Sequence, residues 1–203
     1  MTVKSIERRG SLLVEVRADG ETVSVVGHAA VFNEEAEIGN YFREIIRPGA
    51  FSRAIIEDDV PLLIEHEGLP IARNKSGTLK LSEDAKGLRI DSQLDAQDPD
   101  VQRIIPKMKR GDLSKMSFAF TAVRHEWQDE DKPMPLRILH ECRLYDVSIV
   151  TTPAYDGTDV GLRSLEKWKA DHEAERRRTN FRAAAMRVRL TKNLDLKIRS
   201  KAR

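Results

Sequence analysis

Alternation of apolar and polar residues, the period typical of β-strands, runs through about the first hundred residues of the chain. Val- and Leu-rich segments at 11–17 and 22–32 flank Asp19-Gly20, a dipeptide that favours a tight hairpin turn. Segments 78–81 and 87–94 alternate in the same way and predict a second pair of strands. The pattern therefore predicts a mainly β fold.

Further along, two segments predict longer strands. Lys115–Arg124 alternates, which places Ser117 on the face opposite the large side chains of Met116, Phe118 and Phe120. Leu136–Val150 is the longest strand that the pattern predicts. A serine on the small-residue face of a strand is free to take part in chemistry, because packing does not require a large side chain there.

A brief apolar run, Val60–His66, predicts a buried strand that ends at His66. Gly68 follows and predicts the start of a loop. A histidine at the edge between strand and loop can reach a neighbouring strand more readily than one in the middle of the core.

Helical signals are fewer. A short helix is expected after Pro48-Gly49, within segment 50–59. A second is expected from Asp98 as N-cap to Gly111, with Pro106 kinking its last turn. From Ser164, which can act as an N-cap, the pattern again predicts a helix, and this helix carries an apolar stripe. Thr179-Asn180 is a point where the helix could divide in two. The final twelve residues fit a strand or disorder equally well. The stripe comprises Phe181, Ala184, Ala185 and Val188.

The composition indicates one main domain. The chain has 203 residues, of which 40% are hydrophobic and 33% charged, enough to bury one ordinary core. It has no run of about 18 apolar residues that would span a membrane, and its N-terminus does not resemble a secretory signal. Its one cysteine, Cys142, cannot form an internal disulfide. These features favour synthesis in the cytosol.

The charge is unevenly distributed. Residues 164–203 hold 13 Lys and Arg against 5 Asp and Glu, a net charge of +8, whereas residues 1–163 hold 22 against 28, a net charge of −6. A basic tail of this kind contacts nucleic acid or an acidic protein surface, or is simply a solvated helix.

Six sequence blocks, in this order, resemble the maturation proteases of tailed-phage proheads. The blocks are GHAAVFN (27–33), YFREIIRPGAF (41–51), LLIEHEGLPIAR around His66, TLKLSEDAKGLRI (78–90), RGDLSKMSFAF around Ser117 and SIVTTPAY (148–155). The similarity covers about Val23 to Arg163. It implies a protease domain over residues 1–163 and a largely helical basic tail over 164–203.

The resemblance also implies an architecture. Proteases of this family are similar to the herpesvirus assemblins, so the expected fold is mainly β with peripheral helices (α+β): an antiparallel β-barrel followed by the C-terminal helical tail. The predicted strands agree with this expectation.

The chemistry expected from the resemblance is serine proteolysis. A serine hydroxyl needs a base within hydrogen-bond reach, oriented by a third group; His66 and Ser117 are the expected base and nucleophile. For the third group, the resemblance favours Glu141, because the phage relatives use an acidic residue there. His140 is the second choice, because the assemblins use a second histidine in this role. Asp146 is the third, because a β-bulge can reverse which face of a strand meets the site. The oxyanion donors, usually backbone NH groups, are not identified; the loop Arg110-Gly111-Asp112 before Ser117, Arg143 and Arg163 are candidates.

Other chemistries have little support. The sequence has no H-E-x-x-H or C-x-x-C spacing, so we expect no metal and no cofactor. Cys142 lies within a largely apolar strand, where a thiolate is disfavoured.

The resemblance implies the major capsid protein and the scaffold protein as substrates, together with the protease itself. It places the protein in the host cytoplasm, inside the assembling procapsid. We expect no membrane partner and no nucleic-acid partner, and self-association is left open. Two alternatives remain: a catalytically silent assembly module that binds scaffold, and a nucleic-acid-binding protein that acts through its basic tail.

Overall fold

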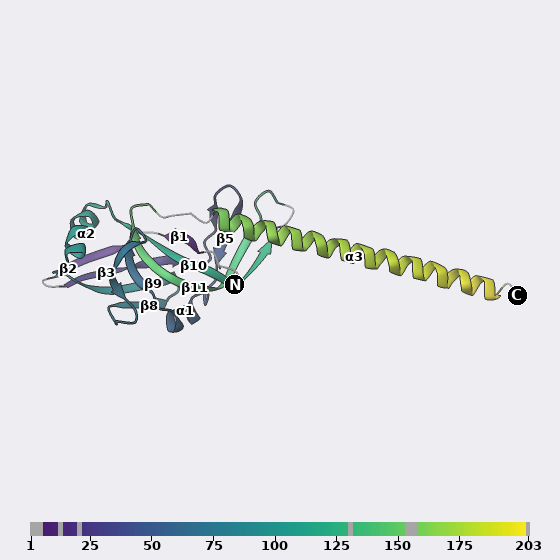
Figure 1. Cartoon of the computed structure of the whole chain (residues 1–203), viewed down its shortest axis with the longest axis horizontal. Helices are drawn as coiled ribbons and strands as arrows, with labels where there is room; N and C mark the ends of the chain where they lie inside the picture. Colours follow the sequence, from purple (N-terminus) through teal and green to yellow (C-terminus); the bar gives the residue numbers. More distant parts are fainter. Residues whose placement is uncertain (1–5, 12–13, 20–21, 130–131, 153–157, 202–203) are drawn as a thin grey trace. The chain divides into compact units, whose positions relative to one another are not determined.

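The computed structural model describes residues 6–11, 14–19, 22–129, 132–152 and 158–201. In these residues the fold is mainly β, with three helices (Figure 1). The chain divides into two compact units, Met1–Leu162 and Arg163–Arg203. All strands and two of the helices belong to the first unit.

The larger sheet is built around two long antiparallel strands, β10 (Lys115–Gln128) and β11 (Leu136–Val150). Figure 1 shows them running side by side. The strand order is β1-β10-β11-β5-β4, with β6 pairing with both β11 and β7. The remaining strands of this sheet are β1 (Glu7–Ser11), β4 (Ala36–Ile38), β5 (Phe42–Ile46), β6 (Pro61–Ile64) and β7 (Glu67–Arg73).

The smaller sheet is antiparallel and has the order β2-β3-β9-β8. Its strands are β2 (Glu15–Asp19), β3 (Thr22–Val31), β8 (Leu79–Glu83) and β9 (Gly87–Asp95). The pairing of β8 with β9 confirms the second strand pair that the alternation predicts. β2 and β3 also pair, with Asp19 opposite Thr22, but the expected turn residue Gly20 lies outside the described residues.

The two short helices match the sequence signals. α1 (Ser52–Glu57) follows Pro48-Gly49 as predicted. α2 (Pro99–Arg110) begins at the predicted cap, where the Asp98 side chain accepts a hydrogen bond from the backbone NH of Asp100 at 2.8 Å. It ends at Gly111, whose φ of 85° is readily adopted by glycine. Pro106 lies inside α2, which continues to Arg110.

The third helix differs from its prediction. α3 (Thr158–Lys201) is one continuous helix, so Ser164 does not cap it, Thr179-Asn180 does not divide it, and its last residues are helical rather than extended. Good helix formers such as Ala, Arg, Lys and Leu fill its length and outweigh the two weak positions. In the described part of the chain, no helix is both long and apolar enough to cross a membrane.

One hydrophobic core joins residues of both sheets. Val25 and Ile90 of the smaller sheet, and Phe118 and Ile149 of the larger, are each at most 1% exposed. Phe118 packs edge-on against Phe51, next to α1, with ring centroids 5.5 Å apart. The core therefore fixes the face of β10 that bears Phe118, which leaves Ser117 on the other face.

The barrel expectation needs correction. Among the described strands no closed barrel forms: they make two sheets, and the larger sheet includes parallel pairs of β11 with β5 and with β6. Parallel pairing joins strands that are distant along the chain, which local alternation does not reveal.

The loop expected from Gly68 is also absent, because β7 pairs there with β6 as a hairpin. Most β7 side chains are exposed, so the segment lacks the apolar alternation that predicts a strand. Only the backbone pairing with β6 identifies β7 as a strand.

Candidate active site

A left-handed turn positions His66. Glu65 and His66, which follow β6, have φ values of 54° and 60°, a conformation that non-glycine residues adopt rarely. Two hydrogen bonds hold this turn to β11 and its end: Glu65 NH donates to Ile149 O at 3.0 Å, and Thr151 NH donates to Glu65 Oε1 at 2.8 Å. Strain of this kind persists where the surroundings over-determine the backbone and is common at functional sites.

β10 positions Ser117. The alternation of this strand points Phe118 into the core and Ser117 to the opposite face, as the sequence predicts. In the register of β10 with β11, Ser117 lies opposite Ser148. Its side chain is fully buried, with 0% exposure.

A bulge in β11 determines which carboxylate meets His66. Ala119 pairs with Asp146 and Phe120 with Leu144, so the register skips Tyr145. Core-facing positions accordingly change from even to odd numbers across the bulge, from Cys142 and Leu144 to Val147 and Ile149. Asp146 and Ser148 are thereby turned toward the face that carries Ser117.

These elements bring one imidazole between a hydroxyl and a carboxylate. His66 Nε2 lies 2.7 Å from Ser117 Oγ, and His66 Nδ1 lies 2.6 Å from Asp146 Oδ1. The side chains of His66 and Asp146 are only 5% and 12% exposed. The arrangement can take a proton from the hydroxyl and stabilise the resulting imidazolium.

Ser148 completes the cluster, and sequence reasoning did not identify it. Its hydroxyl donates to Asp146 Oδ1 at 2.8 Å and lies 3.2 Å from His66 Nδ1. On a strand, a serine two residues after an aspartate lies on the same face as the aspartate. The spacing of Asp146 and Ser148 is therefore the sequence signal that could have identified Ser148.

The structure does not bring Glu141 to His66; Asp146 contacts the imidazole instead. Glu141 pairs with Arg124 of β10 in the register, seven residues from Ser117, which corresponds to roughly 20 Å along a strand. Its carboxylate lies 3.6 Å from Arg53 of α1. His140, the other alternative, lies 3.6 Å from Glu126 and is equally remote. Distance along β11 therefore separates both from the site.

Among the candidate oxyanion donors, the side chains of Arg110 and Arg143 pair elsewhere. Arg110 hydrogen-bonds Asp112 at 2.7 Å, and Arg143 forms an ion pair with Asp58. The side chain of Arg163 lies outside the described residues.

Cys142 faces the core. Burial raises the pKa of its thiol far above the ordinary value, and the nearby carboxylate of Glu44 adds to the effect. The thiol therefore stays protonated and unreactive.

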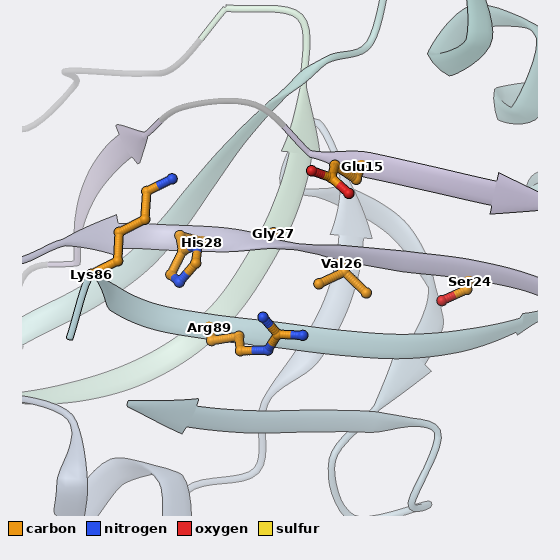
Figure 2. A pocket seen from close by; sticks show the side chains of 7 residues that line it. All are labelled: Glu15, Ser24, Val26, Gly27, His28, Lys86 and Arg89. Atoms are coloured by element: carbon orange, nitrogen blue, oxygen red, sulfur yellow. The ribbon is translucent and has the colours of Figure 1, made fainter. Parts of the chain in front are cut away.

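A separate hollow of about 330 Å³ lies on the smaller sheet and contains none of the three residues around His66. Figure 2 shows its lining: Glu15, Ser24, Val26, Gly27, His28, Lys86 and Arg89. Near it, the ring of His28 hydrogen-bonds Asp84 at 2.8 Å and lowers the pKa of that carboxyl to about 2. This pair joins β3 to the turn between β8 and β9.

Comparison with known proteins identifies the family of the chain. Residues 12–171 match the family of caudovirus prohead serine proteases. The prohead protease of Enterobacteria phage HK97 is 24% identical over 172 residues, which cover 78% of this chain and 72% of that relative. No solved structure matches the chain. The family match extends over most of the sequence, so the chain belongs to the caudovirus prohead serine proteases, enzymes of capsid maturation.

Proposed function

We propose that this protein is an endopeptidase that uses Ser117, His66 and Asp146 to cleave scaffold protein, the scaffold-like segment of the major capsid protein, or both. The observation that carries the proposal is the unbroken hydrogen-bonded path from Asp146 through His66 to Ser117. Membership of the prohead protease family supports the substrate class.

The reaction follows from the roles of the three groups. Ser117 Oγ attacks the carbonyl carbon of the scissile peptide bond as His66 Nε2 accepts its proton. Asp146 accepts the Nδ1–H hydrogen bond, which fixes the tautomer and stabilises the imidazolium. His66 then protonates the leaving amine, and water hydrolyses the acyl-serine ester by the same route.

The supporting hydrogen bond from Ser148 gives Asp146 a fixed direction. Asp146 Oδ1 accepts from both Ser148 Oγ and His66, so its carboxylate cannot rotate freely. Ser148 is in this respect a positioning residue.

Confinement suits such an enzyme. Within an assembling procapsid, substrate and protease are held at high effective concentration, so modest intrinsic affinity suffices. Proteolysis of the scaffold inside the shell frees space and makes maturation irreversible.

Incubation with the capsid and scaffold proteins of the same phage, followed by intact mass measurement, tests the proposal. We expect defined fragments with the native chain and a loss of about 10⁴-fold or more in rate with Ser117→Ala. Ser92→Ala is a matched control, because Ser92 is also buried, at 1% exposure, but lies on β9. Equal fragmentation by Ser117→Ala would reject Ser117 as the nucleophile, and the absence of fragments with the native chain would favour the catalytically silent scaffold-binding module.

A further inference from the structure

Strand β1 covers the nucleophile. It pairs antiparallel with β10, and the register places Gly10 opposite Ser117. The hydroxyl of Ser117 donates a hydrogen bond to the backbone carbonyl of Arg9 at 2.8 Å. Because Ser117 has 0% exposure, a second polypeptide cannot reach it while β1 stays in place.

The position of β1 is the one that an extended substrate would take. Peptides bind to sheet edges as an added strand, with main-chain hydrogen bonds for affinity and alternate side chains for specificity. β1 stands at the end of the strand order, beside β10, which carries Ser117. Ser117 Oγ thus lies 2.7 Å from His66 Nε2 and 2.8 Å from the carbonyl oxygen of Arg9, and its single proton can be donated to only one of them at a time. The peptide carbonyl that lies beside the nucleophile is therefore that of Arg9.

Alternate side chains of β1 enter a buried ionic cluster. Arg9 donates to Glu44 of β5 at 2.7 Å, and Arg137 of β11 donates to Glu7 at 2.7 Å. All four side chains are at most 4% exposed. Arg8, which lies between Glu7 and Arg9, points outward and is exposed.

The charges of this cluster divide evenly between β1 and the rest of the molecule. β1 contributes one carboxylate and one guanidinium, and so does the remainder. If β1 leaves, Arg137 and Glu44 stay 3.2 Å apart and compensate each other. The cluster can thus release β1, or accept another strand with the same charge pattern, without a net buried charge.

The family match begins at residue 12, directly after β1. Removal of the residues up to Arg9 would therefore leave the matched segment whole.

We propose that β1 is an intramolecular substrate: the chain folds in a latent state with β1 in its own substrate site and activates itself by hydrolysing the Arg9–Gly10 bond. This inference rests on the proposed function and specifies its regulation. Ser117 Oγ bonds to the Arg9 carbonyl carbon, the bond to the Gly10 nitrogen breaks, and His66 transfers the proton from Ser117 to the new Gly10 amine. Water then releases Arg9 as a free carboxylate.

The same contacts define the preferred substrate. Glu44 receives a basic side chain immediately before the scissile bond, and Arg137 receives an acidic side chain two residues earlier. Substrate strands that repeat this acidic-x-basic pattern are the preferred class.

Intact mass measurement of the freshly purified full chain over time tests the inference. We expect a species that lacks residues 1–9 to accumulate in the native chain and in Arg8→Ala, and to be absent in Ser117→Ala. Arg9→Ala should slow its formation about 10²-fold or more, because the basic side chain that Glu44 recognises is lost. Circular dichroism of each variant establishes that it is folded.

A fluorophosphonate probe gives a second readout that does not require cleavage of a partner. Ser117 should react in the chain that lacks residues 1–9 and resist the probe in the uncut chain. Rapid labelling of Ser117 in the uncut chain would overturn the latent state.

The outcomes separate this inference from the proposed function. Capsid or scaffold cleavage that depends on Ser117, by a chain that keeps residues 1–9, would overturn self-cleavage and leave the proposed function intact. A chain that neither cuts itself nor cuts those proteins through Ser117 would overturn both.

Discussion

At the scale of residues, the imidazole of His66 depends on groups from two neighbouring strands. β10 supplies Ser117 on one side of the ring, and β11 supplies Asp146 on the other. The left-handed turn at Glu65 and His66 holds the ring between them. A change at any of these positions should act on turnover more than on folding, because none of these side chains belongs to the hydrophobic core.

The role of Asp146 gives a sharp prediction. Asp146→Asn should lower turnover by about 10⁴-fold, because an amide neither stabilises the imidazolium nor enforces the required tautomer. Glu141→Gln should change turnover little, since Glu141 contacts Arg53 rather than His66. Cleavage rates by mass spectrometry and thermal melts of both variants provide the measurement. A larger loss in Glu141→Gln would return the orienting role to that residue.

How far the site can be predicted from the sequence differs from residue to residue. Ser117 lies where simple alternation places it, since the irregularities of β10 come only after it. His66 lies close to the predicted strand end, two residues beyond β6, but the left-handed turn that holds it has no signal in the alternation. Asp146 depends on the bulge that skips Tyr145, and no local signal marks such an insertion. The contact of Ser117 with the Arg9 carbonyl joins residues that lie 108 positions apart, and short-range sequence patterns do not reveal such a contact.

At the scale of elements, the buried cluster ties three strands of the larger sheet together. Glu7 comes from β1, Glu44 from β5 and Arg137 from β11, with hydrogen bonds of 2.7–3.2 Å from Arg137 to the two carboxylates. Buried charges are costly to leave unpaired. The cluster therefore sets the register of β1 against β10 and, with it, the position of the Arg9 carbonyl.

Removal of Arg137 should destabilise the fold strongly. Arg137→Met leaves two buried carboxylates with one guanidinium and should lower the free energy of unfolding by about 3–5 kcal/mol. Arg124→Met on exposed β10 surface is the control and should change it little. Urea denaturation measures both, and equal midpoints for the two variants would contradict the role of the cluster.

The cluster also predicts acid sensitivity. Burial alone would raise the pKa of Glu7, but Arg137 and Arg9 outweigh it and hold the pKa below its ordinary value of 4.5. The unfolded chain then binds the proton more readily than the folded one, so the stabilisation from Glu7 is present above that value and is lost as pH falls through the lower, folded pKa. Glu7→Gln should flatten the stability curve in this acidic range, as denaturation at several pH values can measure. An unchanged slope would show that Glu7 is not the titrating group.

Elements with strong local signals were the predictable ones. α2 has a capping aspartate, a proline at its first position and a terminal glycine, and its bounds follow from them. The β6–β7 hairpin has mostly exposed side chains in β7, and Glu65 and His66, which are not glycines, take left-handed backbone conformations in its turn. The sequence therefore gives no signal for this hairpin, and only the structure shows its backbone pairing. The same holds for the parallel partners of β11, which prevent a purely antiparallel barrel.

At the scale of the whole molecule, an acidic part of the chain, residues 1–163, precedes a basic part, residues 164–203. Residues 164–203 carry a net charge of +8 against −6 for the remainder. α3 is helical through Lys201, and its Phe181 side chain is 76% exposed. The side chains of Ala185 and Val188, two members of the expected apolar stripe, lie outside the described residues. We expect this segment to recruit the enzyme to an acidic partner in the prohead.

Truncation tests that expectation. A chain that ends near Arg163 should stay folded and retain Ser117-dependent cleavage of a short peptide, yet fail to enter proheads. Western blotting of purified proheads, with the full chain as reference, measures incorporation. Insolubility or loss of peptide cleavage would instead make the segment part of the folded core.

The separation of β1 from β10 along the chain has a consequence for biosynthesis. β1 leaves the ribosome before Ser117 and Asp146, which follow more than a hundred residues later. Pairing over such a distance closes a long loop and is slow to nucleate, but the strand that covers the serine is already present when the β10–β11 hairpin forms. Each newly made chain therefore contains the strand that covers Ser117 before it contains Ser117 itself.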